Sequence, residues 1–402
     1  MYDYSSYHPR HFCVVAELAV SRTENDYRIA LQAVQARHPS LSALIARDSR
    51  NVPHFVSASH HIEPSILPRD QGPDWREIIE RELVQDFLEG EPLARATVLY
   101  TPDEATIILT FHHAIADGIA GVFIIEDIMR ALAGRDLGKL QVPASLDDRA
   151  MALRQEPSTI VDRGSSNLEH IGEQILIESA GKPLWRSFAT DRVITNTIAL
   201  DTRFLDRARQ LSRSHGTTIH GAICTALAVA ASQVEGSSEY TILNPINSRS
   251  ALGFQDRGCV MLASAATHSI PETTLATFWQ RARQYTNDVA ASRSRENLLA
   301  GVRMLQDRLP PDGDQRLACG LMGAFPYDAV VSNLGKLEIQ DRIDDVDLRG
   351  FWGPSGQARL RRERFIGVAT TNNVIRLVEA APAFQPPLLQ SLKAVLVEAC
   401  SL

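Results

Sequence analysis

The chain has 402 residues, which is long enough for two domains or lobes with separate cores. Its apolar content of 44 % and charged content of 22 % are ordinary for a soluble globular protein. Lys and Arg number 41 against 48 Asp and Glu, so the net charge is −7, and no dense basic cluster interleaves with aromatic residues. Nucleic-acid binding is therefore not expected.

The cysteines and the apolar runs further limit the class of protein to which the chain can belong. The five cysteines are scattered and form no CxxC pair, which argues against a disulfide framework and against a zinc site. The N-terminus shows no signal peptide, and the longest apolar run, residues 222–231, is about half of the ~20 residues that a membrane-spanning helix needs. We expect no membrane-spanning segment and a location in a reducing cytoplasm.

The first part of the chain predicts strands and helices in an irregular order. The predicted elements are a strand at 11–19, helices at 25–37 and 75–88, strands at 94–100 and 105–111 around a turn at 101–104, and a helix at 119–132 that is closed by Gly134. Residues 135–190 are polar, contain prolines and show weak periodicity. This segment is typical of a crossover between two lobes.

The second part continues the same irregular alternation. The predicted elements are a strand at 193–200, helices at 202–215 and 218–233, a strand at 240–246, an amphipathic helix at 275–294, strands at 329–332, 365–371 and 374–379, and a helix at 387–398. Asn372 and Asn373 form the turn of a final hairpin. We expect a layered α/β fold and not a regular doubly wound sheet.

The motif that carries chemistry is His112-His113-Ala114-Ile115-Ala116-Asp117-Gly118. At average residue usage, HHxxxDG arises by chance in roughly one in a thousand chains of this length. It follows a predicted strand and precedes a helix, which is where α/β proteins present reactive groups. A neutral imidazole takes a proton from an alcohol or amine near pH 7 and returns it later, so one histidine is a candidate general base.

Three alternative roles compete for the same residues. Two neighbouring histidines are often packed and hydrogen-bonded without a catalytic role. A metal site is disfavoured because adjacent strand side chains diverge and only Asp117 is near in sequence, so we expect no metal. Ser-His-Asp hydrolysis is disfavoured because no G-x-S-x-G elbow occurs.

HHxxxDG between a strand and a helix resembles the chloramphenicol acetyltransferase-like superfamily, which includes condensation domains, plant BAHD acyltransferases and polyketide-associated acyltransferases. The BAHD signature DFGWG is missing. The stand-alone length and the Ser-Asn-Leu-Gly segment favour the polyketide-associated or alcohol-acyltransferase branch. Five further segments match in order: residues 37–41, 90–95, 218–222, 244–249 and 331–335.

The resemblance implies two similar α/β lobes in a V, with strand exchange and a tunnel between them. We place the N-terminal lobe with the motif and the crossover at residues 1–185, and the C-terminal lobe at 186–402. The resemblance also implies that His113 faces the middle of the tunnel and deprotonates the acceptor, which attacks an acyl thioester directly. No cofactor is expected to be bound, and acyl-CoA or an acyl-carrier protein would be the co-substrate.

The motif's other residues receive supporting roles. Asp117 is expected to pair with Arg249 and to brace the turn that aims His113, with direct orientation of His113 as the alternative. His112 is expected to pack, and Gly118 to permit a tight turn or close approach. Three residues stay open between two roles: Ser332 and Asn333 between an oxyanion donor and a strand-end turn, and Trp352 between tunnel lining and core.

The leading functional hypothesis is an O-acyltransferase that acts on a hydroxyl of a small molecule. Two alternatives remain: an amide-forming condensation enzyme with an amine acceptor, and a catalytically silent, condensation-like protein that only docks carrier proteins. The nature of the acceptor nucleophile separates the first two, since the same base serves both. The complete motif argues against the third.

Overall fold

The computed structural model describes residues 10–57, 61–154, 192–255, 257–309, 327–357 and 363–401. The elements of the first half are, in chain order, β1 (His11–Ala19), α2 (Glu24–Arg37), η1 (Pro39–Ser42), β2 (Ala43–Arg47), β3 (Pro53–Ser57), β4 (Ser65–Pro68), α3 (Trp75–Glu82), β5 (Ala94–Tyr100), β6 (Glu104–His112), α4 (Gly118–Leu132) and α5 (Leu146–Arg154). Those of the second half are β7 (Val193–Leu200), α7 (Thr202–Ser214), α8 (Ile219–Glu235), β8 (Glu239–Asn247), β9 (Ala263–Pro271), η3 (Leu275–Thr277), α9 (Phe278–Ser292), α10 (Arg295–Arg308), β10 (Ala329–Lys336), β11 (Arg342–Ile343), β12 (Val346–Gly356), β13 (Arg364–Thr371), β14 (Val374–Pro382) and α12 (Leu389–Ala399).

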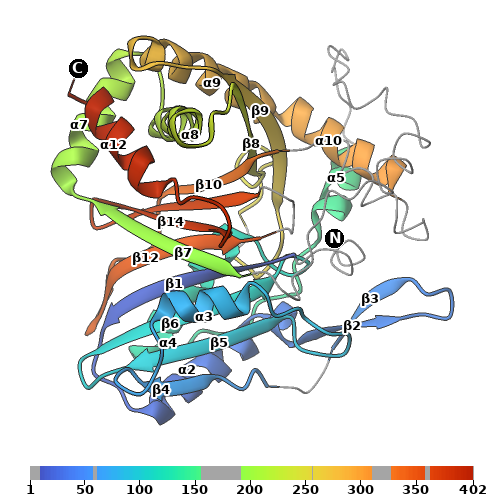
Figure 1. Ribbon diagram of the computed structural model, residues 1–402. Helices are drawn as coiled ribbons and strands as arrows, with labels where there is room; N and C mark the ends of the chain where they lie inside the picture. Colours follow the sequence, from blue (N-terminus) through green and yellow to red (C-terminus); the bar gives the residue numbers. More distant parts are fainter. Residues whose placement is uncertain are drawn as a thin grey trace.

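Two six-stranded sheets form the centres of two lobes (Figure 1). The first sheet has the order β11-β12-β1-β6-β5-β4 and the second has the order β7-β14-β13-β10-β8-β9, while β2 and β3 pair separately. In Figure 1, α3 lies in front of the strands of the first sheet and α2 and α4 lie behind them, while α7, α8, α9 and α12 gather above the second sheet. The predicted two-lobed α/β class is therefore confirmed, while the V arrangement and the tunnel stay predictions.

Alternation along β1 separates two cores. Phe12 and Val14 point into the core that the first sheet shares with α2 and α4. Cys13 and Val15 point to the opposite face, where they pack with residues of α3 and with Val330 of β10. Side chains from both lobes therefore fill the second of these cores.

Local signals explain where several elements begin and end. Thr23 and Asp26 form a capping box at the start of α2, and His38-Pro39 follows its last turn. Asn372 and Asn373 have φ values of 51° and 57°, the left-handed region that a tight hairpin turn requires. These features confirm the predicted helix at 25–37 and the predicted final hairpin.

The predicted helix at 75–88 is too long. In the structure α3 ends at Glu82, where the amides of Val84 and Gln85 bond to carbonyls three residues back instead of four. The guanidinium of Arg95 donates to the carbonyl of Gln85 at 2.8 Å and to that of Asp86 at 3.4 Å. The sequence signal also missed β2, β3, β4, β9, β11, β12, α5 and α10.

Strand β12 is the most consequential of the missed elements. Its two internal glycines and a proline are typical of a turn, yet it lies between β11 and β1 in the first sheet, with Phe351 opposite Ala16 and Trp352 opposite Val15. A strand from the second half of the sequence thus completes the sheet of the first half (Figure 1). This is the strand exchange that the resemblance implied.

The exchange brings β12 against β13 at one very close contact. A Cβ atom on Gly367 would lie 1.9 Å from the backbone oxygen of Pro354, which cannot rotate away. Gly367→Ala is therefore expected to lower the free energy of unfolding by about 1–3 kcal/mol, the usual cost of overpacking, measured by urea denaturation. Gly301→Ala in α10 is the control, since nothing lies within 4 Å of its Cβ position and its stability should rise slightly. Equal stability of both variants would contradict the close contact.

The predicted boundary between residues 185 and 186 lies outside the described residues and stays a prediction. Part of the predicted crossover at 135–190 is described, and it contains the helix α5. Among the described residues no single helix has the length and apolar character to cross a membrane, although α7 and α8 together, bent by 97°, would meet both criteria.

Candidate active site

The motif occupies the turn between β6 and α4. His112 is the last residue of β6, and the amide of His113 donates to the carbonyl of Arg10 at 2.6 Å. Asp117 caps α4, where its Oδ1 accepts from the amide of Ala120 at 2.9 Å. The motif residues are therefore held between a sheet strand and a helix start, as the sequence predicted.

The hydrogen bond of His113 defines its tautomer. Its Nδ1 lies 3.1 Å from the carbonyl oxygen of Ala116, and a carbonyl can only accept, so Nδ1 carries the proton. In the neutral ring Nε2 then holds the lone pair. The ring is half-buried and packs on Phe12, with 4.5 Å between the ring centroids. His113 therefore presents an unprotonated nitrogen on an immobilised ring.

The surroundings of His113 keep it neutral at pH 7. Burial, aided by the positive charge of Arg10, lowers the pKa of His113 to about 4, against the opposing effects of the Ala116 carbonyl and the Asp117 carboxylate. A ring with this pKa is free of a second proton throughout the neutral range. It is available as a proton acceptor.

His112 has the opposite tautomer and a different environment. Its Nδ1 accepts from the amide of Ala114 at 3.0 Å, and its buried ring contacts the edge of Phe87. Burial lowers the pKa of His112 to about 3. Because the Nδ1 lone pair is used inside the turn, His112 is placed to hold the shape of the turn, which agrees with its predicted packing role.

The lowered histidine pKa values predict a pH effect on stability. Between pH 6.5 and about 4 the unfolded chain protonates His113 while the folded protein does not. The free energy of unfolding is therefore expected to fall on acidification through this window. His113→Asn should make the fall shallower in urea titrations between pH 6.5 and 5, where few carboxylates titrate. Parallel curves for the two proteins would contradict the lowered pKa.

Asp117 pairs with Arg249, as the sequence predicted. Its Oδ2 accepts from Nη1 of Arg249 at 2.7 Å and from the amide of Leu262 at 2.8 Å. The side chain of Arg249 is 7 % exposed and that of Asp117 is 4 % exposed, so the ion pair is buried. Within the described residues no hydrogen bond joins Asp117 to His113. The geometry supports bracing of the turn and not a catalytic triad.

Gly118 permits a close approach between the lobes. A Cβ atom at this position would lie 2.9 Å from Cδ2 of Leu334 and 3.3 Å from Cγ of Pro354. The ends of β10 and β12 therefore rest on the motif. Of the two predicted roles of Gly118, close approach is the one that the contacts support.

The remaining predicted site residues, Ser332, Asn333 and Trp352, have three different environments. Ser332 is buried on β10, next to Gly367 in the parallel register and two positions before Leu334. Asn333 uses its Oδ1 to accept from the amide of Gly335 at 2.8 Å, which is a turn contact. Trp352 packs with Trp75, 5.7 Å between centroids, in the core on the opposite sheet face from Phe12. The structure thus does not bring Trp352 to His113.

Several contacts around the motif have no local signal in the sequence. Arg10 shifts the pKa of His113, and the amide of Leu262 completes the hydrogen bonds of Asp117. His38 and Asp127 form a buried pair 2.9 Å apart behind the motif. In the sequence, residues 37–41 indicate only a helix end, because no local pattern reveals a partner on another helix.

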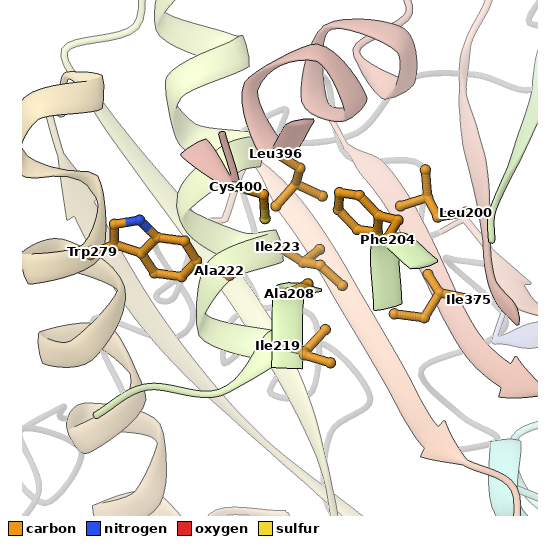
Figure 2. Close-up of a pocket in the computed structure, with 10 residues that line it drawn as sticks. All are labelled: Leu200, Phe204, Ala208, Ile219, Ala222, Ile223, Trp279, Ile375, Leu396 and Cys400. Atoms are coloured by element: carbon orange, nitrogen blue, oxygen red, sulfur yellow. The ribbon is translucent and has the colours of Figure 1, made fainter. Parts of the chain in front are cut away.

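A small pocket, with a volume of about 10 Å³, lies elsewhere, between α7, α8, α9 and α12. Figure 2 shows that its lining is apolar, with Phe204, Ile223 and Trp279 among the side chains around it. None of the lining residues belongs to the motif. This cavity is not the predicted tunnel, which stays a prediction.

Metal and thiol chemistry find no support in the described part of the chain. There, no group of three or more His, Cys, Asp and Glu side chains is arranged to hold a metal ion. Four cysteines lie in the described part of the chain, and all are free and buried: Cys13, Cys224, Cys259 and Cys400. Cys319 lies outside the described residues. Burial raises the pKa of the Cys13 thiol to about 12, which makes that thiol a poor nucleophile.

The structure thus combines two lobes, an exchanged strand and a pair of histidines at the end of β6. The family model of the Condensation domain matches residues 7–257. The chain belongs to the condensation-domain family, a family of acyl- and peptidyl-transferring domains of secondary metabolism.

The curated relatives are much longer proteins. A part of tyrocidine synthase 3 from Brevibacillus parabrevis is 25 % identical over 268 residues, which is 63 % of this chain and 4 % of that protein. A part of malpinin synthetase from Mortierella alpina is 27 % identical over 237 residues, which is 52 % of this chain and 3 % of that protein. The chain therefore spans only a few per cent of the length of the curated relatives it matches.

Solved structures share the fold at low identity. Polyketide synthase associated protein 5 from Mycobacterium tuberculosis is 12 % identical, with a TM-score of 0.66 and coverage of 100 % of this chain and 95 % of that one. The first condensation domain of the CDA synthetase is 11 % identical, with a TM-score of 0.64 and coverage of 98 % and 89 %. At these identities the likeness establishes the fold alone.

Proposed function

We propose that this protein transfers an acyl group from an acyl-CoA or acyl-carrier-protein thioester to the hydroxyl of a small molecule. The observation that carries the proposal is the fixed tautomer of His113, whose Nδ1 is bonded to the Ala116 carbonyl at 3.1 Å. Nε2 is thereby left as the one ring nitrogen able to accept a proton. General-base activation of a nucleophile needs this arrangement.

The proposed reaction balances without a cofactor. Nε2 of His113 takes the proton of the acceptor hydroxyl as its oxygen attacks the thioester carbonyl. The resulting tetrahedral oxyanion collapses with cleavage of the carbon–sulfur bond, and the imidazolium returns the proton to the thiolate. A hydroxyl from Ser332 is our candidate donor to the oxyanion. Asn333 is a weaker candidate, because its side-chain oxygen already serves the turn at Gly335.

Amide formation is the second candidate, and the family match favours it. A further curated relative, from Salinispora arenicola, is named a probable non-canonical nonribosomal peptide synthetase, and the same base serves an amine acceptor. In that reaction the neutral amine attacks the thioester carbonyl, and Nε2 removes a proton from the nitrogen, which becomes cationic as the carbon–nitrogen bond forms. The carbon–sulfur bond then breaks, and the imidazolium gives the proton to the leaving thiolate. A docking-only role is disfavoured, because the neutral, oriented base would then have no use.

A panel of donors and acceptors tests the proposal. The protein is incubated with acyl-CoA or acyl-carrier protein and with matched alcohols and amines. The release of free thiol is followed over time, and the products are identified by mass spectrometry. An ester product supports O-acyl transfer, and an amide product supports condensation instead. Thiol release no faster than with the His113→Ala variant, across the whole panel, would sink both.

A further inference from the structure

One segment of the second half of the chain reaches across to the motif. We call residues 257–262 the strap. The amide of Leu262 donates to Oδ2 of Asp117 at 2.8 Å, and the thiol of Cys259 donates to the carbonyl of Ile115 at 3.3 Å. The strap is therefore hydrogen-bonded to two residues of the motif turn, Ile115 and Asp117.

The strap is also tied to Arg249. The carbonyl of Val260 accepts from Nη2 of Arg249 at 3.2 Å, while Nη1 of the same guanidinium binds Asp117. Arg257, at the other end of the strap, pairs with Glu126 of α4. Both ends of the strap are thus anchored near the helix that Asp117 caps.

The middle of the strap rests on a fully buried histidine. The amide of Cys259 donates to Nδ1 of His38 at 3.3 Å, so this nitrogen must be unprotonated. The other ring nitrogen of His38 then carries the proton and donates to Oδ2 of Asp127 at 2.9 Å. His38 is 1 % exposed, and Arg37 adds a second donor to Asp127 at 2.7 Å. The carboxylate on α4 therefore orients the ring that supports the strap.

These contacts converge on the atom that sets the tautomer of His113. Ala116 lies between Ile115 and Asp117, the two residues that the strap holds, and its carbonyl accepts from Nδ1 of His113. A displaced strap would move this carbonyl, release Nδ1 and let the proton exchange between the two ring nitrogens. The ring would then spend part of its time with no lone pair on Nε2.

We propose that His38 is a positioning residue for His113, acting through Cys259 and the strap, with Asp127 orienting the His38 ring. The inference rests on the proposed function in taking His113 as the base. Small displacements of a catalytic group lower rates strongly, and about 1 Å can cost a hundredfold. A merely structural His38 would affect stability and leave the tautomer of His113 unchanged.

Two isosteric variants separate the two bonds of His38. His38→Asn places an amide oxygen near the position of Nδ1 and keeps the bond from Cys259, whereas His38→Gln reaches the position of Nε2 and keeps only the bond to Asp127. We expect His38→Gln to lower kcat roughly 10–100-fold with KM changed less than about threefold. His38→Asn should retain most of the activity, since the strap keeps its support.

The second readout does not depend on activity. Nitrogen-15 chemical shifts of the His113 ring distinguish the two tautomers, and wild type should show a proton on Nδ1. His38→Gln should show a tautomer mixture, and Cys259→Ala, which retains the backbone amide, should show a smaller shift in the same direction. Arg37→Gln is the control: it removes a partner of Asp127 without touching the strap, so its His113 spectrum should match wild type.

The outcomes separate this inference from the proposed function. A tautomer mixture in folded His38→Gln supports the inference even if no acyl transfer is found with any substrate. An active wild type whose His113 spectrum and kcat are unchanged in His38→Gln overturns it. If His38→Gln does not fold, Cys259→Ala decides, and a wild-type His113 spectrum in that variant also overturns the inference.

Discussion

Replacing His113 with alanine is expected to lower kcat by roughly 10²–10⁴, the usual contribution of a positioned general base. The side chain is half-buried and donates a hydrogen bond to a turn carbonyl, so the variant should fold. Initial rates at saturating donor and acceptor give kcat, and circular dichroism with urea denaturation checks folding.

His112→Ala is the matched comparison, because it removes the neighbouring imidazole. His112 is 2 % exposed and holds the amide of Ala114, so its loss should act mainly on stability and on the shape of the turn. A folded but inactive His112 variant beside an active His113 variant would reverse the assignment of the base.

Replacing Asp117 with alanine is expected to lower the free energy of unfolding by about 3–5 kcal/mol, because it leaves the Arg249 guanidinium buried without its counter-charge. The amides of Ala120 and Leu262 also lose their acceptor. Urea denaturation with an unchanged m value measures the loss. Activity should fall as well, since the turn that carries His113 loses its brace.

A double-variant comparison isolates the ion pair from the other roles of Asp117. Asp117→Ala combined with Arg249→Met removes both charges and keeps an apolar chain in the space of the guanidinium. This protein should be more stable than Asp117→Ala alone, because no uncompensated charge remains. A loss below about 1 kcal/mol in the single variant would contradict a buried pair.

Much of the local structure followed from short-range patterns in the chain. The capping box at Thr23 and Asp26 and the hairpin turn at Asn372 and Asn373 depend on side chains and backbone angles within a few residues. The motif also identified His113 at a strand end. Such features are predictable because their partners lie nearby in the sequence.

Other elements could not be predicted because their stability comes from distant partners. β12 contains glycines and a proline that favour a turn, and it becomes a strand because β1 pairs with it along most of its length, while β11 pairs with its first two residues. The turns that follow α3 are held by Arg95, which donates to the carbonyls of Gln85 and Asp86. Neither partner is visible in a local window.

The sequence alone determined the two-lobed α/β class, the place of the HHxxxDG motif and, with the resemblance, the pairing of Asp117 with Arg249. The tertiary structure decided which nitrogen of His113 holds the lone pair, because that depends on one carbonyl at 3.1 Å. It also decided what holds this carbonyl, since the strap and His38 come from distant parts of the chain and meet only in the folded protein. Hydrogen-bond geometry of a few tenths of an ångström is set by packing, which no local pattern encodes.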